Sequence, residues 1–559
     1  MVLTAYPPRA GAAWLSRVTQ LPGVVASVHV TPADPAELVK QITVSIGELG
    51  SRIAMGGSPL LVQRAERALE DAQTLLHKID QEQQQVVYLT VVLLVLASDE
   101  DELRRRVRQV EASAAAAGMR ASVALFAQEQ GLRSAGPWAV LDEAIRRMGG
   151  HNMPIETMAA GYPMARSGIN HGRGILLGRD QDGGIVLVDR WSAEAAQEGL
   201  VNPNVNILGA SGGGKSFAAK LLALREYARG ARLLILDPER EYRPLARALG
   251  GAWINAAGGE GRLNPLEIRP LPPDIDAEPE EGTSPLQGRG PLAVHLQRVV
   301  MTWLQLYLPG LDDLERATLS QAVLAAYRDH GIGWETDPAT VKRWPTVADV
   351  YRHVRDAGAE RLAVLLEPAV SGAESALWCG QTTLPPAGDV TVVDIRDLVD
   401  AQETVRRAQY FALLTWAWDL VRAGQAEGRR TVLLVDEAWL LADPQTPQAL
   451  AFLRDLSKRI RKYQGSLVVV TQNSVDFLDP AIRRYGEPVV ANAATKLFFR
   501  QESRDLEALT QLFRLTEAEQ VLLSGAKRGE ALLIAGNSRV RLTTEASDVE
   551  ARVIAGGGL

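Results

Sequence analysis

The sequence predicts an α/β protein in which a parallel sheet is built around a glycine-rich loop and a smaller α+β unit precedes it. The glycine-rich turn at residues 209–216 lies between an apolar run and a run with helical spacing. Further apolar runs of β-forming residues end in polar side chains, as buried parallel strands do. Ahead of them, residues 21–128 alternate between strand-like and helix-like segments.

Length and composition limit the class of protein. A chain of 559 residues is too long for one core, so we expect two or three domains. The hydrophobic content of 46% and charged content of 23% are ordinary for a soluble globular protein. The net charge of −7 excludes a generally basic surface for nucleic acid, although a local basic channel stays open. Cys379 is the single cysteine, which excludes an intrachain disulfide and a cysteine-based metal site.

Residues 1–165 are predicted to form an α+β assembly or docking domain with its connector. Strand-like runs at 23–31, 86–97 and 119–126 alternate with helix-like runs at 34–49, 59–85 and 99–117. This order is typical of a ferredoxin-like sheet with helices on one side. Residues 137–164 carry glycine and proline breaks and are interpreted as the connector.

No membrane-spanning or secretory segment is predicted. The most apolar run, at 86–97, is shorter than the roughly 20 residues that a transmembrane helix needs. The first eight residues lack the basic start and apolar run of a signal peptide. We therefore expect a cytoplasmic protein that attaches to membranes only through partners.

Residues 166–559 are predicted to form a nucleotide-binding domain around a phosphate-binding loop. The sequence Gly209-Ala-Ser-Gly-Gly-Gly-Lys215-Ser216 reads G-x-x-x-x-G-K-[ST], the Walker A pattern. A strand-like run before it and a helical run after it place backbone N–H groups around a polyphosphate. We expect Lys215 to reach the β- and γ-phosphates of ATP and the Ser216 hydroxyl to bind Mg²⁺. The predicted nucleotide-binding residues are Gly209, Ala210, Ser211, Gly212, Gly213, Gly214, Lys215 and Ser216.

The remaining elements follow from the same patterns. Residues 268–385 are mainly helical by their spacing and are interpreted as an insertion, which contains a loop at 270–290 rich in proline, glycine and acidic residues. Further strands are predicted at 231–238, 390–395, 430–437, 465–472 and 493–500, with helices at 403–422, 449–461, 503–513 and 516–523, and with hairpins at 175–190 and 530–543.

An acidic pair is the second strong signal. Four apolar β-forming residues lead into Asp436 and Glu437, the Walker B pattern. We expect Asp436 to hold Mg²⁺, directly or through water, and Glu437 to polarise the attacking water. Gln472 ends another buried strand, where its amide has the chemistry to orient water or sense the γ-phosphate. The alternative reading of these residues is a set of solvated polar groups at strand ends.

A basic run separates these two strands. An oligomeric motor needs an arginine that enters the neighbouring subunit's site and stabilises charge in the transition state. The alternative reading is a solvated helix face. The candidates are Arg454, Lys458, Arg459, Arg461 and Lys462.

Taken together, these motifs resemble the VirB4 family, the conjugation and type IV secretion ATPases of the HerA/FtsK superfamily. The residues that carry the resemblance are Gly209–Ser216, Asp237-Pro-Glu-Arg-Glu-Tyr242, Asn264-Pro265, Val435-Asp-Glu-Ala438, Arg461-Lys-Tyr-Gln-Gly-Ser-Leu467 and Thr471-Gln472.

The resemblance implies a RecA-like motor that hydrolyses ATP with Mg²⁺ at subunit interfaces of a homo-oligomer, with a hexamer as the candidate assembly. It implies a position at the cytoplasmic face of the inner membrane, with secretion-channel proteins as partners and DNA as a candidate partner. Arg461 becomes the first choice for the trans-acting arginine, and Gln472 for the sensor. The alternatives are a HerA/FtsK-like DNA translocase and a nucleotide-binding scaffold with little turnover; the acidic Glu437 argues against the scaffold.

Overall fold

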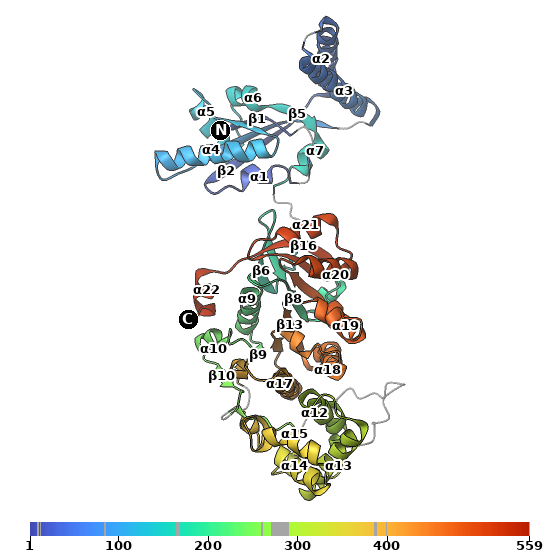
Figure 1. The fold of residues 1–559 in the computed structure, drawn as a ribbon. Coiled ribbons are helices and arrows are strands. Elements are labelled where there is room, and N and C mark those ends of the chain that lie inside the picture. The colour runs from blue at the N-terminus through green and yellow to red at the C-terminus, as the bar shows by residue number, and fades with distance from the viewer. Residues whose placement is uncertain are drawn as a thin grey trace. The chain divides into compact units, whose positions relative to one another are not determined.

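The computed structural model describes residues 1–7, 10–11, 13–56, 58–82, 85–163, 168–258, 261–269, 290–384, 388–398 and 400–557. The chain divides into two compact units, Met1–Arg166 and Ser167–Leu559 (Figure 1).

The first unit contains an antiparallel sheet with the strand order β2-β3-β1-β4, in which β5 also pairs with β3. The sequence predicted helices on one side of this sheet, and that prediction is wrong. Leu89 and Val91 of β3 pack with Val110 of α4 on one face, whereas Val92 packs with Ile145 of α6 on the other. Because β3 is apolar on both faces, both need cover. The strands are β1 (Val2–Ala5), β2 (Val24–Pro32), β3 (Val86–Val95), β4 (Arg120–Ser122) and β5 (His151–Pro154).

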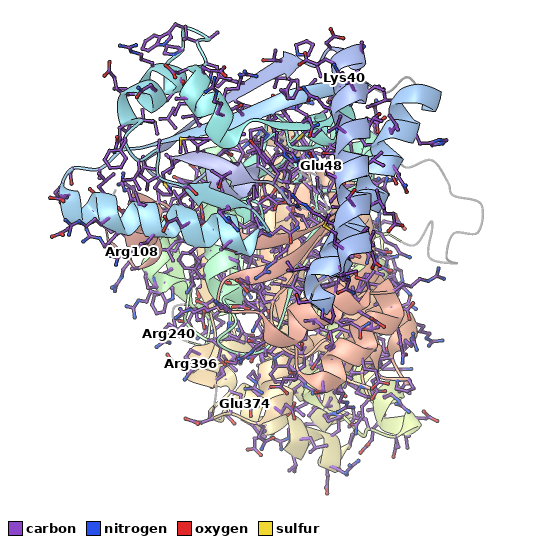
Figure 2. All side chains as sticks on the ribbon, turned by 90° about the horizontal axis from the view of Figure 1, so that it is seen from above. Lys40, Glu48, Arg108, Arg240, Glu374 and Arg396 are labelled. Carbon is purple, nitrogen blue, oxygen red and sulfur yellow. The ribbon has the colours of Figure 1, made fainter. Side chains whose placement is uncertain are left out.

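The helices of this unit include a long hairpin, α2 (Pro35–Met55) and α3 (Pro59–Glu82). Charged side chains such as Lys40 and Glu48 on α2 and Arg108 on α4 are exposed (Figure 2). The segment interpreted as a connector instead contains α6, β5 and α7, so it belongs largely to the folded unit. The remaining helices are α1 (Ser16–Thr19), α4 (Glu100–Ala116), α5 (Gln128–Ala135), α6 (Glu143–Gly149) and α7 (Ile155–Ala160).

Within the described part of the second unit, eleven strands form one sheet in the order β10-β11-β9-β12-β13-β8-β14-β15-β16-β6-β7. The strands from β10 to β14 are parallel, and the last four are antiparallel to their neighbours. The strands are β6 (Ile175–Asp180), β7 (Ile185–Val188), β8 (Val205–Leu208), β9 (Arg232–Asp237), β10 (Ala252–Asn255), β11 (Val390–Asp394), β12 (Thr431–Val435), β13 (Gly465–Thr471), β14 (Thr495–Phe498), β15 (Glu530–Ala535) and β16 (Ser538–Thr544).

Helices cover both faces of the parallel part, which explains why its strands read as continuous apolar runs. Leu233 and Ile235 of β9 pack with the α9 face, and Leu234 and Leu236 pack with the α17 face. The confirmed architecture is therefore a mixed α/β unit with a large parallel sheet. Its helices outside the insertion are α8 (Ala193–Gln197), α9 (Lys215–Ala228), α10 (Arg243–Ala248), α17 (Glu403–Gly424), α18 (Pro447–Arg459), α19 (Arg483–Asn492), α20 (Ser503–Phe513), α21 (Glu517–Gly525) and α22 (Asp548–Ile554).

The helices between β10 and β11 share the core of the α17 face. Trp303, Tyr307 and Trp378 form an aromatic cluster with ring centroids 4.9–5.9 Å apart. The helices are α11 (Pro291–His295), a π-helical turn at Leu296–Val300, α12 (Met301–Tyr307), α13 (Asp313–Asp329), α14 (Val347–Asp356), α15 (Glu360–Val370) and α16 (Ser375–Trp378). The predicted loop at 270–290 falls, except for Gly290, outside the described residues. No helix in the described ranges is both long and apolar enough to cross a bilayer.

Candidate nucleotide-binding site

The phosphate-binding loop connects β8 to α9, as the sequence predicted. Gly212 and Gly214 have φ angles of 76° and 110°, in the left-handed region that glycine tolerates without strain. A Cβ added to Gly209 would lie 2.7 Å from the Cβ of Phe499, so close packing also requires glycine here. The loop therefore opens onto the N-terminus of α9, where a polyphosphate would meet its free N–H groups.

Lys215 is buried at the start of α9, and its Nζ donates to the backbone oxygen of Ala210 at 3.0 Å. Burial lowers the pKa of Lys215, while the carboxylates of Glu437, Asp436 and Glu241 act in the opposite direction. These three acids therefore lie near the ammonium group, although the strands that carry them are far apart in sequence.

The strand order brings the second motif to the loop. β13 lies between β8 and β12, so the ends of all three strands meet at one edge of the sheet. Glu437 follows β12 with a left-handed φ of 46°. Its Oε1 accepts from Nε2 of Gln472 at 2.7 Å, and its Oε2 accepts from Nε1 of Trp439 at 2.6 Å. Two neutral donors thus fix a carboxylate whose pKa is raised by burial.

No sequence motif pointed to Trp439. Its position two residues beyond the acidic pair is the one sequence feature that could have indicated it. Once the chain turns at Glu437, the indole can reach the carboxylate of Glu437.

Asp436 is 4% exposed, and burial and the nearby Glu437 raise its pKa to about 8. Its Oδ1 accepts from the backbone N–H of Glu437 at 2.9 Å. It forms no ion pair with the described residues. A buried acid with unused oxygen lone pairs fits a divalent cation, and the Ser216 hydroxyl at the start of α9 is the chemically matched second ligand. Among the described residues, no group of three or more His, Cys, Asp or Glu forms another metal site.

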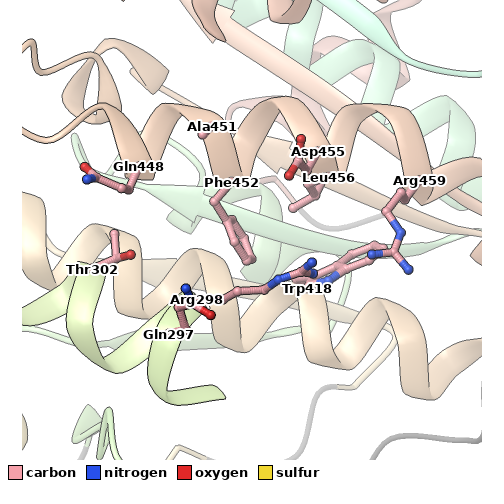
Figure 3. A pocket seen from close by; sticks show the side chains of 10 residues that line it. All are labelled: Gln297, Arg298, Thr302, Trp418, Gln448, Ala451, Phe452, Asp455, Leu456 and Arg459. Atoms are coloured by element: carbon pink, nitrogen blue, oxygen red, sulfur yellow. The ribbon is translucent and has the colours of Figure 1, made fainter. Parts of the chain in front are cut away.

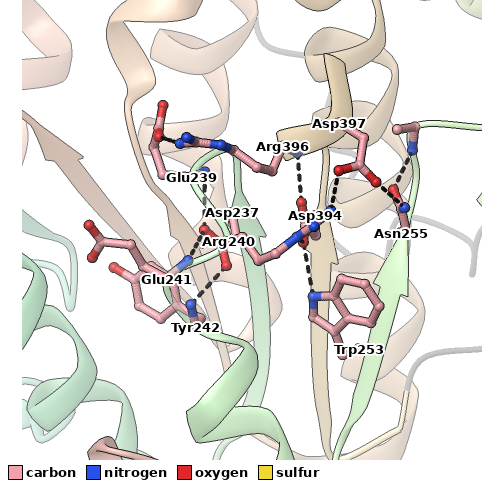
Figure 4. A network of polar contacts seen from close by, with 11 residues as sticks. Asp237, Glu239, Arg240, Glu241, Tyr242, Trp253, Asn255, Asp394, Arg396 and Asp397 are labelled. Atoms are coloured by element: carbon pink, nitrogen blue, oxygen red, sulfur yellow. Dashed lines mark hydrogen bonds and ion pairs between the residues drawn. The ribbon is translucent and has the colours of Figure 1, made fainter. Parts of the chain in front are cut away.

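A second acidic turn lies beside this site. Asp237 ends β9 fully buried, and its carboxylate accepts from the backbone N–H groups of Glu239, Glu241 and Tyr242 at 3.3, 3.0 and 2.8 Å (Figure 4). A polar turn therefore follows β9 at the carboxyl edge of the sheet, and Asp237 holds it together.

The next strand end is tied to this turn by Arg240. Its guanidinium pairs with Asp394 at 2.5 Å and with Asp397 at 2.7 Å (Figure 4). The Trp253 indole also donates to Asp394, at 3.1 Å. These contacts cross-link the ends of β9, β10 and β11.

Arg461 is not brought to Lys215 within one chain. It lies before β13, at the amino edge of the sheet and therefore at the edge opposite the loop, and its guanidinium donates to the backbone oxygen of Val201 at 2.9 Å. Arg454 of the same basic run pairs with Asp455 at 2.6 Å. Lys458, Arg459 and Lys462 also precede β13.

A separate cavity of about 210 Å³ lies where α18 and α17 meet the helices of the insertion (Figure 3). Arg298, Trp418, Phe452 and Asp455 are among its lining residues. Of the predicted candidates only Arg459 of the basic run lines it; the loop, the acidic pair and Gln472 do not.

The loop, the buried lysine and the fixed acidic pair on a parallel sheet define a P-loop nucleoside triphosphatase. A family model described as the central domain of helicase HerA matches residues 195–320, and one described as the TraG P-loop domain matches residues 419–537. A solved structure of VirB4 of Thermoanaerobacter pseudethanolicus is 47% identical, with a TM-score of 0.63, over 69% of this chain and 100% of that chain. The chain belongs to the VirB4 family, which confirms the resemblance inferred from the motifs.

Two curated proteins extend the comparison. An uncharacterized protein of Bacillus anthracis is 22% identical over 93% of this chain and 87% of its own length. The type IV secretion system protein virB4 of Bartonella quintana is 28% identical over 130 residues, which are 23% of this chain and 15% of that protein.

Proposed function

We propose that this chain is an ATP-hydrolysing motor that energises substrate transfer or pilus assembly in a type IV secretion system. Membership of the VirB4 family and the name of the Bartonella relative support the system. The observation that carries the enzymatic part is the Glu437 carboxylate, fixed by Gln472 and Trp439 beside Lys215. A scaffold without turnover needs no such oriented base.

Each residue has a distinct role in this proposal. Lys215 neutralises charge on the β- and γ-phosphates, and Glu437 takes the proton of the attacking water. Gln472 holds Glu437 in place and presents its amide oxygen to that water. Ser216 and Asp436 would hold Mg²⁺, which supplies positive charge to the phosphate oxygens when bound.

Steady-state ATP hydrolysis by the purified chain tests this proposal. Glu437→Gln keeps the size of the side chain and one acceptor oxygen but cannot accept the proton, so turnover should fall at least about 100-fold. Lys215→Ala should abolish turnover. Near-normal hydrolysis in either variant would contradict the site assignment.

Arg461 is proposed to act in the site of a neighbouring copy, within a homo-oligomer whose candidate form is a hexamer. Its position at the edge opposite the loop supports this, because a head-to-tail ring joins opposite edges of adjacent subunits. Arg461→Ala should leave nucleotide affinity intact and reduce turnover on the order of 10³-fold.

Co-assembly with a second variant separates this role from a structural one. Mixing Arg461→Ala with Glu437→Gln creates interfaces that carry an intact Glu437 and an intact Arg461, so part of the activity should return. A mixture that stays inactive would point to another member of the basic run, or to a structural role through Val201.

A DNA translocase is the second candidate function, favoured by the match to the central domain of helicase HerA. Titration of the hydrolysis assay with single- and double-stranded DNA discriminates the two. Strong stimulation that is lost in Glu437→Gln indicates direct action on DNA. Low turnover indifferent to DNA favours a secretion ATPase that awaits its membrane partners.

The first unit is proposed as the docking domain toward inner-membrane channel proteins, with the chain peripheral at the cytoplasmic face. Its ferredoxin-like character is part of the proposal and is supported by the strand order β2-β3-β1-β4 and by α4 between β3 and β4. Association of residues 1–163 with channel proteins in membrane fractions tests it.

A further inference from the structure

The phosphate-binding loop is packed between two segments that no motif predicted. The backbone N–H of Ala210 donates to the oxygen of Arg500 at 2.7 Å, just beyond β14. On the same side, the N–H of Gly529 donates to the oxygen of Gly213 at 3.0 Å, from the turn that leads into β15. A Cβ on Gly214 would lie 3.0 Å from the nitrogen of Gly529, so this turn closely contacts the loop.

Both segments carry a free cation. Arg500 and Arg528 are exposed, and neither guanidinium forms a hydrogen bond or ion pair within the part of the chain that the structure describes. The backbone of Arg500 and the residue after Arg528 contact the phosphate-binding loop directly. Both guanidinium groups are therefore available to an anion bound there.

The sheet order assigns the acids and these cations to opposite sides of the loop. Asp436, Glu437 and Gln472 lie at the ends of β12 and β13, on one side of β8, whereas Arg500 and Arg528 lie at the ends of β14 and β15, on the other. If Glu437 is the base, the γ-phosphate must lie toward β12 and β13. The α-phosphate and the nucleoside then lie toward the arginines.

We propose that Arg528, assisted by Arg500, binds the α-phosphate side of the nucleotide held by the same chain and sets the affinity that ATP and ADP share. This inference rests on the proposed function for the position of the γ-phosphate. Arginine suits the role because its guanidinium donates two parallel hydrogen bonds to a phosphate.

Equilibrium binding of ADP and of a non-hydrolysable ATP analogue to the full chain tests the inference. Arg528→Ala should raise both dissociation constants about tenfold, and Arg500→Ala should raise both by a smaller factor, since each removes a charge-assisted hydrogen bond. The turnover number at saturating ATP should stay within about twofold of wild type. Arg528→Lys, which keeps the charge but not the paired donors, should give an intermediate affinity.

Arg343→Ala is the matched control, because Arg343 is also exposed and free of partners among the described residues but lies in the helical insertion. Unchanged ADP affinity in Arg528→Ala, with or without a loss of turnover, would overturn the inference. So would a loss confined to DNA-stimulated turnover, which would assign the arginines to nucleic acid. ADP binding is measured without hydrolysis, so an inactive wild-type chain would contradict the proposed function while leaving this test intact.

Discussion

Asp237 and Asp436 end neighbouring strands of one sheet and are both almost fully buried, yet their surroundings differ. Three backbone N–H groups donate to the carboxylate of Asp237. Among the described residues, a single backbone N–H donates to that of Asp436. Burial raises the pKa of Asp237 to about 6. Burial also raises the pKa of Asp436, there to about 8, because Glu437 adds like charge and fewer donors compensate.

The difference separates a structural acid from a ligand-binding acid. Donors from its own turn occupy the lone pairs of Asp237, so that this carboxylate stabilises the turn and has little capacity left. Asp436 is buried with less compensation from donors, at a cost that protonation or a bound cation offsets. Burial by itself does not distinguish the two roles. The number of donors that already bond to each carboxylate does.

Substitution of Asp436 should give the largest effect, and it should be on activity. Asp436→Asn preserves shape but removes the charge that would hold Mg²⁺, so turnover should fall on the order of 10³-fold or more. Thermal stability without the cation should be unchanged or higher, because the cost of burying an ionisable carboxyl is gone. A calorimetric scan measures stability and the hydrolysis assay measures turnover. A large loss of stability would mean that Asp436, like Asp237, has a structural role.

Substitution of Asp237 should have the opposite signature. Asp237→Ala leaves three backbone N–H groups without their acceptor and should destabilise the second unit by about 3 kcal/mol. Urea unfolding measures this loss. Nucleotide-dependent activity at low temperature should survive in the fraction that stays folded. A stable but inactive variant would make Asp237 a second ligand-binding acid.

Lys496 extends the comparison to a buried cation. Its Nζ donates to the backbone oxygen of Ala493 and lies 5.4 Å from the centroid of the Phe513 ring. Burial and the nearby Arg539 lower the pKa of Lys496 to about 8. Because the unfolded lysine keeps its usual pKa near 10.5, the unfolded state binds more protons between pH 8 and 10.5. Stability from this group therefore rises with pH across that window and is lowest below pH 8.

Lys496→Met should consequently stabilise the protein by about 2 kcal/mol at pH 7. The gap between the variant and wild type should narrow as the pH approaches 10.5. Thermal melts at several pH values measure it. A gap that is constant with pH would mean that packing, and not charge, decides the difference.

Substitution in an exposed ion pair should give the smallest effect. Glu239 and Arg396 form an ion pair across the acidic turn, but both side chains are more than 40% exposed. Arg396→Ala should change stability by less than about 1 kcal/mol, since water and salt screen such pairs. Melts in low and high salt check this, and a large effect would show that the turn depends on its surface as well as on Asp237.

Much of the parallel sheet could be predicted because buried parallel strands are continuous apolar runs, as in β8, β9, β12 and β13. By contrast, β5 consists of His-Asn-Met-Pro and becomes a strand only because β3 offers it an edge. α22 was also missed, although Ser547 and Glu550 form a capping box at its start. β5 thus depends on a tertiary partner that no local pattern shows, whereas α22 had a local signal in its capping box.

The same limit applies to the site. Lys215, Asp436, Glu437 and Gln472 stand in recognisable motifs, and the structure places them together. Trp439 and the turn at Gly529 were missed because their contacts with the site arise from the chain's path in space. The role of Arg461 depends on a second copy of the chain, and it stays a prediction.

The pairing of β6 with β16 has a consequence for the chain on the ribosome. The ion pair between Arg179 and Glu545 beside these strands spans 366 residues. At roughly 5–20 residues per second, the β6–β7 hairpin waits about 20–70 s for the strand that covers its edge. During that time the Gly529 turn has not yet reached the phosphate-binding loop. Nascent chains of this protein thus expose the edge of β6 until β16 has been made, and the phosphate-binding loop gains its Gly529 contact at the same late stage.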